Sequence, residues 1–159
     1  MVIDGAGERD RTGSLIERWY GEVWNQGREA SIFELMHPEA EIFGVGTVPI
    51  HGPEEFLPFW KTARKNYPDL HIDIDRLVLE QEQGMALITM HGTRIVSGNA
   101  VQMQGAVYFR FHDGLLVFGR NVLDYLAILG QSDVLDLDIR QALFPIPDPE
   151  NPQGPEGAD

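Results

Sequence analysis

The chain has 159 residues, of which 43% are hydrophobic and 23% charged, a composition typical of one globular domain. Its formal net charge of −13 argues against a nucleic-acid partner and against an anionic membrane surface, since both require clustered lysine and arginine. The chain contains no cysteine, which excludes disulfides and thiolate metal sites.

The N-terminal residues predict a short polar arm over 1–11. The sequence MVIDGAGERD lacks the basic and apolar segments of a secretory signal. No apolar run reaches the ~18 residues that span a bilayer. Because a chain without cysteine also suits a reducing compartment, we expect a cytoplasmic protein without a membrane partner.

Helical signals dominate the first half of the folded region. Thr12 or Ser14 is suited to cap a helix that Gly27 ends, and a short helix over 30–36 and a short strand over 39–46 follow. A second full helix is predicted over 51–67, because Pro68 prevents it from continuing.

The periodicity changes to two from residue 70 onward, which predicts four strands over 70–80, 84–98, 100–114 and 115–124. Asp113-Gly114 between the last two strands is a strong hairpin signal. Helices followed by antiparallel strands indicate an α+β fold, in which a curved sheet wraps over the helices as a cone with a mouth. Residues 132–145 could form a further helix, and the Pro-rich acidic residues after them are expected to be disordered.

Asp124 is the leading catalytic candidate, although it has a second interpretation. A tight hairpin would place Phe109 opposite Phe118, which puts Phe118, Arg120 and Asp124 on one strand face with Leu116 and Val122. Partial desolvation there would raise the pKa of the Asp124 carboxyl toward a value useful for proton transfer. Alternatively, Asp124 is the N-cap of the helix that follows. The two roles are compatible.

Six short motifs carry a resemblance to a known family. They are EVWNQG (22–27), HGPEEF (51–56), YPDLHIDI (67–74), GTR (92–94), FRFHDG (109–114) and LDYLAILGQ (123–131). In this order the chain resembles the SnoaL-like polyketide cyclases of the NTF2-like superfamily over residues 12–131. The family often has histidine at the position of Arg94, and an acidic residue and tryptophan near Gly119 and Arg120.

The resemblance implies an α+β cone that performs an intramolecular aldol condensation without cofactor or metal. It further implies that Asp124 is the acid/base carboxylate and that the protein is a homodimer. The domain would span 12–131, followed by a C-terminal extension over 132–159.

Four basic residues are candidates for stabilising a substrate oxyanion, and each has a structural alternative. Arg120 could instead lie at the sheet edge, and His91 could be a structural histidine. His51 precedes a helix and could be an ordinary surface residue, while Arg94 is a comparable candidate. The five histidines show no metal-binding spacing, so we expect no metal.

Aromatic residues are expected to line the cone and bind a flat, apolar small molecule. The candidates are Tyr20, Trp24, Trp60, Tyr108, Phe109 and Phe118. The expected function is cofactor-independent acid/base catalysis on an aromatic or polyketide-like oxygenated substrate through an enolate or phenolate. Aldol cyclisation, its reverse, isomerisation and dehydration all remain open. The alternatives are a non-catalytic small-molecule-binding domain or a dimeric interaction domain.

Overall fold

The computed structural model describes residues 5–131, so the predicted helix and acidic tail over 132–159 lie outside the described residues. The helical elements are α1 (Gly5–Arg18), the π-helix η1 (Trp19–Asn25), α2 (Ala30–Leu35), α3 (Gly52–Asn66) and α4 (Tyr125–Gln131). The strands are β1 (Met36–Phe43), β2 (Ile50–His51), β3 (His71–Glu80), β4 (Gln83–Thr93), β5 (Ala100–His112) and β6 (Leu115–Leu123).

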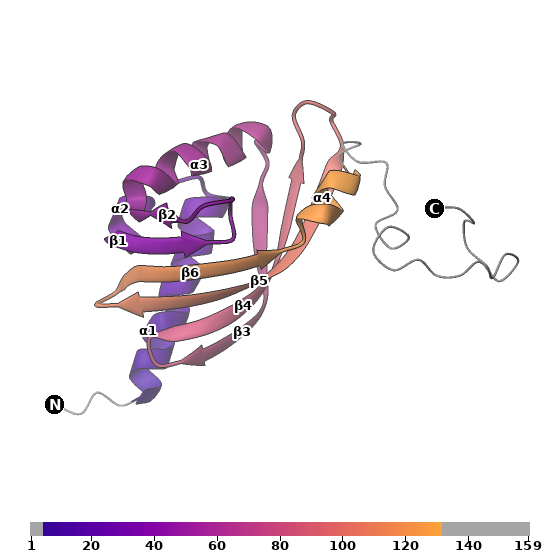
Figure 1. Cartoon of the computed structure of the whole chain (residues 1–159). Helices are drawn as coiled ribbons and strands as arrows, with labels where there is room; N and C mark the ends of the chain where they lie inside the picture. Colours follow the sequence, from indigo (N-terminus) through magenta and orange to yellow (C-terminus); the bar gives the residue numbers. More distant parts are fainter. Residues whose placement is uncertain (1–4, 132–159) are drawn as a thin grey trace, which may run out of the picture.

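The six strands form one curved sheet in the order β2-β1-β6-β5-β4-β3 (Figure 1). Only the β1–β6 pair is parallel among the strand pairs of residues 5–131. The helices α1, η1 and α3 cover the concave face of the sheet, and the core lies between the two layers. The predicted α+β class and its mainly antiparallel sheet are therefore confirmed.

The first helix differs from the prediction, because it begins at Gly5 inside the segment expected to be a polar arm. Thr12 is not its cap. The Thr12 side chain is buried, and its hydroxyl donates to the Gln81 carbonyl at 2.6 Å, which ties α1 to the β3–β4 turn. At the other end of the helical region Gly27 has φ +68°, as the predicted left-handed stop requires.

The π-helix η1 continues α1 without a break and widens its turn. A π-helix bonds residue i to i+5, so residues five apart lie on one side. Trp19 and Trp24 therefore both face α3, where their rings lie 5.3 and 5.9 Å from the ring of Phe56. Isolated π turns occur frequently at functional sites.

The β5–β6 hairpin has the predicted turn but not the predicted register. Asp113 and Gly114 both have positive φ, as a tight turn requires. A β-bulge then leaves Val117 without a partner, and this extra residue shifts the pairing by one position. A one-residue shift moves every following side chain to the opposite face of the strand.

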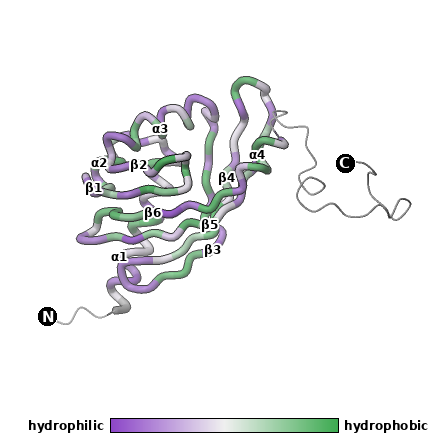
Figure 2. The backbone as a smooth tube through the Cα atoms, in the orientation of Figure 1, coloured by the Kyte–Doolittle hydropathy of each residue, from purple (hydrophilic) through white to green (hydrophobic). Residues whose placement is uncertain are grey.

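Apolar residues recur along the strands and in α4, whereas the residues of α1 are mostly polar or near neutral in hydropathy (Figure 2). The inward residues of β4 and β5 include Ala86, Ile88, Val107 and Phe109, all buried. None of the helices within residues 5–131 is both long and apolar enough to cross a membrane.

Candidate functional site

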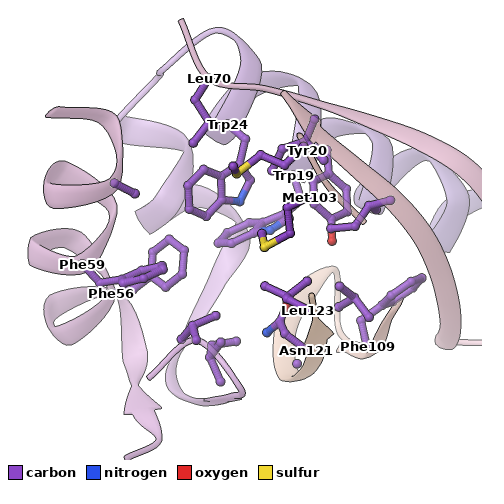
Figure 3. Close-up of a pocket in the computed structure, with 18 of the residues that line it drawn as sticks. Trp19, Tyr20, Trp24, Phe56, Phe59, Leu70, Met103, Phe109, Asn121 and Leu123 are labelled. Carbon is purple, nitrogen blue, oxygen red and sulfur yellow. The ribbon is translucent and has the colours of Figure 1, made fainter. Parts of the chain in front are cut away.

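A cavity of about 250 Å³ lies between the helices and the concave face of the sheet (Figure 3). Its helix side is formed by aromatic residues of η1 and α3, and its sheet side by inward residues of β4, β5 and β6. The principal lining residues are Trp19, Tyr20, Trp24, Phe56, Phe59, Tyr67, Met90, Met103, Phe109, Leu116, Gly119, Asn121, Leu123, Tyr125 and Ile128. Such a lining suits a flat, largely apolar molecule.

The aromatic side of the cavity is a set of rings in mutual contact. Trp24 packs edge-on against Phe56 and Phe59, at centroid distances of 5.9 and 6.2 Å. Phe56 and Phe59 are 5.6 Å apart, also edge-on. These tilted arrangements are the favourable ones for aromatic pairs, and they fix the shape of this wall.

Tyr20 supplies a polar group in this apolar cavity. Its side chain is only 5% exposed, and Figure 3 shows its hydroxyl oxygen pointing from the helix side toward the strand side. The hydroxyl has no hydrogen-bond partner within residues 5–131. Burial raises the pKa of Tyr20 above its ordinary value, so the phenol stays neutral and remains a donor at physiological pH.

Asn121 is a second polar group, on the strand side. Its Nδ2 donates to the Phe43 carbonyl at 2.8 Å, which holds the amide against the end of β1. The Oδ1 atom accepts no hydrogen bond within the described part of the chain, so it is available to a ligand hydroxyl.

The described lining of the cavity contains no acidic or basic side chain. None of the described residues that line the cavity is an aspartate, glutamate, histidine, lysine or arginine. Nor does any group of three acidic or histidine side chains within residues 5–131 have the arrangement of a metal site. The polar chemistry of the cavity therefore rests on neutral donors and acceptors.

Three of the six aromatic candidates, Tyr20, Trp24 and Phe109, line the cavity, and their role in substrate binding stays a prediction. Trp60 is buried behind the wall instead, and its indole N–H donates to the Val23 carbonyl at 3.0 Å.

Tyr108 and Phe118 lie on the outer, convex face of the sheet. Their rings are 5.9 Å apart, and the Tyr108 hydroxyl donates to Gln83 Oε1 at 2.6 Å. The bulge at Val117 explains this placement, because it pairs Tyr108 with Arg120 and turns Phe118 outward.

The same shift removes Asp124 from the apolar face predicted for it. Asp124 is exposed, and its Oδ1 accepts the backbone N–H of Ala127 at 3.0 Å, so it is the N-cap of α4. Its own N–H donates to the Gln104 carbonyl at 3.0 Å. The capping alternative is thus observed, while the catalytic role stays a prediction.

The basic candidates also lie outside the cavity lining. Arg120 is exposed on the convex face, with its guanidinium 4.7 Å from the Phe43 ring centroid. His91 lies half-exposed on the convex face, its Nε2 3.2 Å from Asp73 Oδ2.

His51 and Arg94 lie at the edges of the molecule. His51 belongs to the edge strand β2, where its Nδ1 is 3.4 Å from Glu55 Oε2. Arg94 belongs to the β4–β5 hairpin loop, in which its N–H donates to the Asn99 carbonyl at 2.9 Å. Neither is among the described residues that line the cavity.

Several lining residues escaped the sequence analysis, above all Asn121, Gly119 and Tyr125. Regular strand alternation assigns Asn121 and Gly119 to the outer face. The bulge that reverses them carries no clear sequence signal, since Val117 is an ordinary strand residue. Tyr125 could have been noticed, because it directly follows a helix cap at the end of the last strand.

Comparisons with known proteins agree with this architecture. A family model described as a SnoaL-like domain matches residues 16–118. Among solved structures, the chain is similar to a candidate SnoaL-like polyketide cyclase from Jannaschia sp. CCS1. The TM-score is 0.75 at 18% identity, covering 84% of this chain and 99% of that one.

Two structures from Streptomyces are similar as well. TsrD from Streptomyces laurentii gives a TM-score of 0.71 at 22% identity, covering 80% of this chain and 98% of that one. Wild-type IdmH, a candidate polyketide cyclase from Streptomyces antibioticus, gives 0.68 at 22% identity, covering 76% and 96%. No curated protein matches the sequence. At these identities the likeness establishes the fold, and the ligand has to be inferred from the cavity.

Proposed function

This chain belongs to the SnoaL-like family, and we propose that its aromatic cavity binds and cyclises an apolar, oxygenated small molecule of polyketide type. Family membership supports a polyketide-related cyclase in general. The choice of substrate and chemistry rests on the cavity, which combines aromatic walls with a few neutral polar groups.

The observation that carries the proposal is the buried Tyr20 hydroxyl without a partner. An unsatisfied buried donor costs about 1–3 kcal/mol, and a ligand carbonyl that accepts its hydrogen bond would remove that cost. Because burial raises the pKa of Tyr20, its phenol stays protonated. It therefore donates a hydrogen bond and does not act as a phenolate. In the cavity, this donor would polarise a ketone and stabilise the oxyanion that forms on it.

The neutral lining favours a substrate that supplies its own nucleophile. A 1,3-dicarbonyl unit enolises readily, so a strong base on the protein is not required. The enol carbon attacks the ketone carbon held by Tyr20, and one C–C bond forms. The ketone oxygen, which accepts the Tyr20 hydrogen bond, gains the proton that the enol oxygen loses, so the product is a cyclic isomer of the substrate. A preorganised oxyanion donor of this kind contributes about 10²–10³-fold to a rate.

Asn121 would position the same substrate from the opposite wall. Its amide is held by the hydrogen bond to Phe43, which fixes the direction of Oδ1. A phenol hydroxyl of the substrate donating to Oδ1 would lie across the cavity from Tyr20. Two fixed contacts on opposite walls fold a flexible chain into one reactive conformation, which supplies much of the advantage in an intramolecular reaction.

The experiment compares Tyr20→Phe with wild type on a panel of aromatic β-polyketones. Turnover is measured by product formation, and binding by quenching of the cavity tryptophans. We expect kcat to fall about 100-fold with a smaller change in KM, because the lost contact is strongest in the transition state. Tyr108→Phe is the matched control, because Tyr108 carries its hydroxyl hydrogen bond on the outer face. Equal turnover by Tyr20→Phe and wild type would overturn the role of Tyr20.

A non-catalytic binding domain is the second candidate, and the neutral lining is the observation that favours it. In that case the β-polyketones bind, and their affinity depends on Tyr20. Neither wild type nor Tyr20→Phe then raises the rate of cyclisation above the rate in buffer alone.

A further inference from the structure

Helix α4 stands at the boundary between the cavity and solvent. Tyr125 and Ile128 of this helix line the cavity, yet the Tyr125 side chain is 42% exposed. A residue that lies both on the cavity wall and at the surface marks the mouth. Figure 1 shows α4 at the same end of the molecule as the C-terminal part of α3 and the β4–β5 hairpin.

Hydrogen bonds join the segments that surround this mouth. Asn66 at the end of α3 accepts the N–H of Ile95 in the β4–β5 hairpin at 2.9 Å. Asn99 of the same hairpin donates from Nδ2 to the Gln131 carbonyl of α4 at 3.3 Å. On the other side, the Tyr125 hydroxyl donates to the Gly44 carbonyl at the end of β1, at 2.9 Å.

Helix α4 packs mainly against β5, and its side chains are at most partly buried. It has seven residues and no buried side chain, although its sequence YLAILGQ is apolar (Figure 2). A helix this short has little stability of its own. Its far end is tethered by the Gln131 amide, which donates to the Gln102 carbonyl at 2.9 Å and accepts the Gln102 N–H at 2.7 Å. Segments with few buried contacts open first.

The Gly44 side of the mouth is rigid by comparison. Gly44 has φ +78°, and a Cβ added there would lie 1.9 Å from the Asn121 carbonyl oxygen. The backbone directly after β1 therefore packs closely against β6 at Asn121. A movement of α4 away from this side would open the mouth and break the Tyr125–Gly44 hydrogen bond.

We infer that Tyr125 controls ligand access to the cavity, with α4 as the moving segment and the Tyr125–Gly44 hydrogen bond as its latch. This inference rests on the proposed function in one respect, namely that the cavity is the ligand site. The ligand class is the same apolar, aromatic molecule. Tyr125 determines the rates at which the ligand enters and leaves the cavity, and Tyr20 acts on the bound ligand.

The test uses N-phenyl-1-naphthylamine, a neutral aromatic probe whose fluorescence rises in apolar surroundings, in stopped-flow binding to the full chain. Tyr125→Phe keeps the ring and removes the latch. We expect association and dissociation rates each to rise about five-fold, the value of one hydrogen bond of ordinary net strength, with Kd nearly unchanged. Gln131→Ala, which loosens the far end of α4 without touching the cavity, should raise both rates as well.

Tyr108→Phe serves again as the matched control and should bind with wild-type rates. Wild-type rates in both Tyr125→Phe and Gln131→Ala would overturn the gate while leaving the proposed function intact. A wild-type chain that fails to bind the probe would overturn the ligand cavity, and with it the proposed function. A large change in Kd without a change in association rate would make Tyr125 an ordinary binding residue and contradict the inference.

Discussion

Gly119 of β6 pairs directly with Phe109 of β5, so the smallest possible side chain lies opposite a buried ring on the cavity wall. A Cβ added to Gly119 would approach the Cδ1 atom of Ile42 to 3.1 Å, tighter than an ordinary contact. The absence of a side chain at this position therefore maintains part of the cavity.

Gly119→Val should fill this space. We expect binding of the neutral aromatic probe to weaken at least ten-fold and stability to fall by about 1–3 kcal/mol, the usual cost of overpacking. Urea unfolding and equilibrium titration measure the two effects. Gly7→Ala in α1 is the control, since an added Cβ there meets nothing within 4 Å and a helical alanine stabilises. Unchanged probe binding in a folded Gly119→Val chain would show that this wall does not touch the ligand.

The inward position of Gly119 could not be predicted from the sequence, whereas several other features of the fold could. The α+β class follows from the change of periodicity along the chain. Local chemistry predicts the helix end at Gly27 and the Asp113-Gly114 turn, because each needs only a few adjacent residues. The bulge at Val117 depends on how two strands fit the curvature of the whole sheet. Local patterns do not contain that information.

The candidate site depended on this one feature more than on any other. With a regular hairpin, Asp124 and Arg120 would share a face with Leu116, and an acid/base site would follow. With the bulge, Gly119 and Asn121 take the inward positions, and Asp124 is left to cap α4. Tyr20, Trp24 and Phe109 were predictable because their positions do not depend on the register of β6.

Asp124 can be tested by two substitutions that separate its possible roles. As a cap, Asp124→Asn should preserve the hydrogen bond to Ala127, whereas Asp124→Ala should cost α4 about 0.5–2 kcal/mol. Hydrogen exchange of the α4 amides reads this difference directly. If Asp124 instead moves a proton, both substitutions abolish turnover alike. We expect the capping pattern, with turnover by Asp124→Asn close to wild type.

Glu22 of η1 predicts a pH-dependent contribution to stability. Its carboxylate accepts hydrogen bonds from Arg18 Nε at 2.7 Å, Ser31 Oγ at 2.6 Å and Arg28 Nη1 at 2.8 Å. The hydrogen bond from Arg18 is the largest cause that lowers the pKa of Glu22 from 4.5 to about 2, and the one from Ser31 is next. A lowered folded-state pKa adds stability above the unfolded-state pKa, and this is lost as the pH falls toward 2.

Glu22→Gln should therefore cost about 1–2 kcal/mol at pH 7, a value that allows for solvent screening at this partly exposed site. The difference from wild type should shrink below pH 4.5 and vanish near pH 2. Denaturant unfolding across pH measures it, and high salt should reduce it. Glu39→Gln is the control, because the Glu39 side chain makes no ion pair within residues 5–131. A difference in unfolding free energy between Glu22→Gln and wild type that stays constant from pH 7 to pH 2 would contradict this pH-dependent role of Glu22.

The convex face of the sheet predicts self-association. It exposes a group of apolar side chains from three strands, namely Val78 (65%), Met85 (49%), Leu87 (51%) and Val122 (69%). Their positions are neighbours in the ladder, since Val78 pairs with Met85, and Ala106 pairs with both Leu87 and Val122. An exposed apolar sheet face of this kind is a common site for a symmetric interface.

We expect a homodimer with twice the 17.9 kDa mass of the chain, measured by light scattering or sedimentation. Leu87→Lys should convert it to a monomer, because a pair related by two-fold symmetry places the new charge in the interface twice. Phe33→Lys is the matched control, since Phe33 is 44% exposed on α2, away from this face. A wild-type chain that stays monomeric at high concentration, or a Leu87→Lys chain that stays dimeric, would assign the apolar face to something other than self-association.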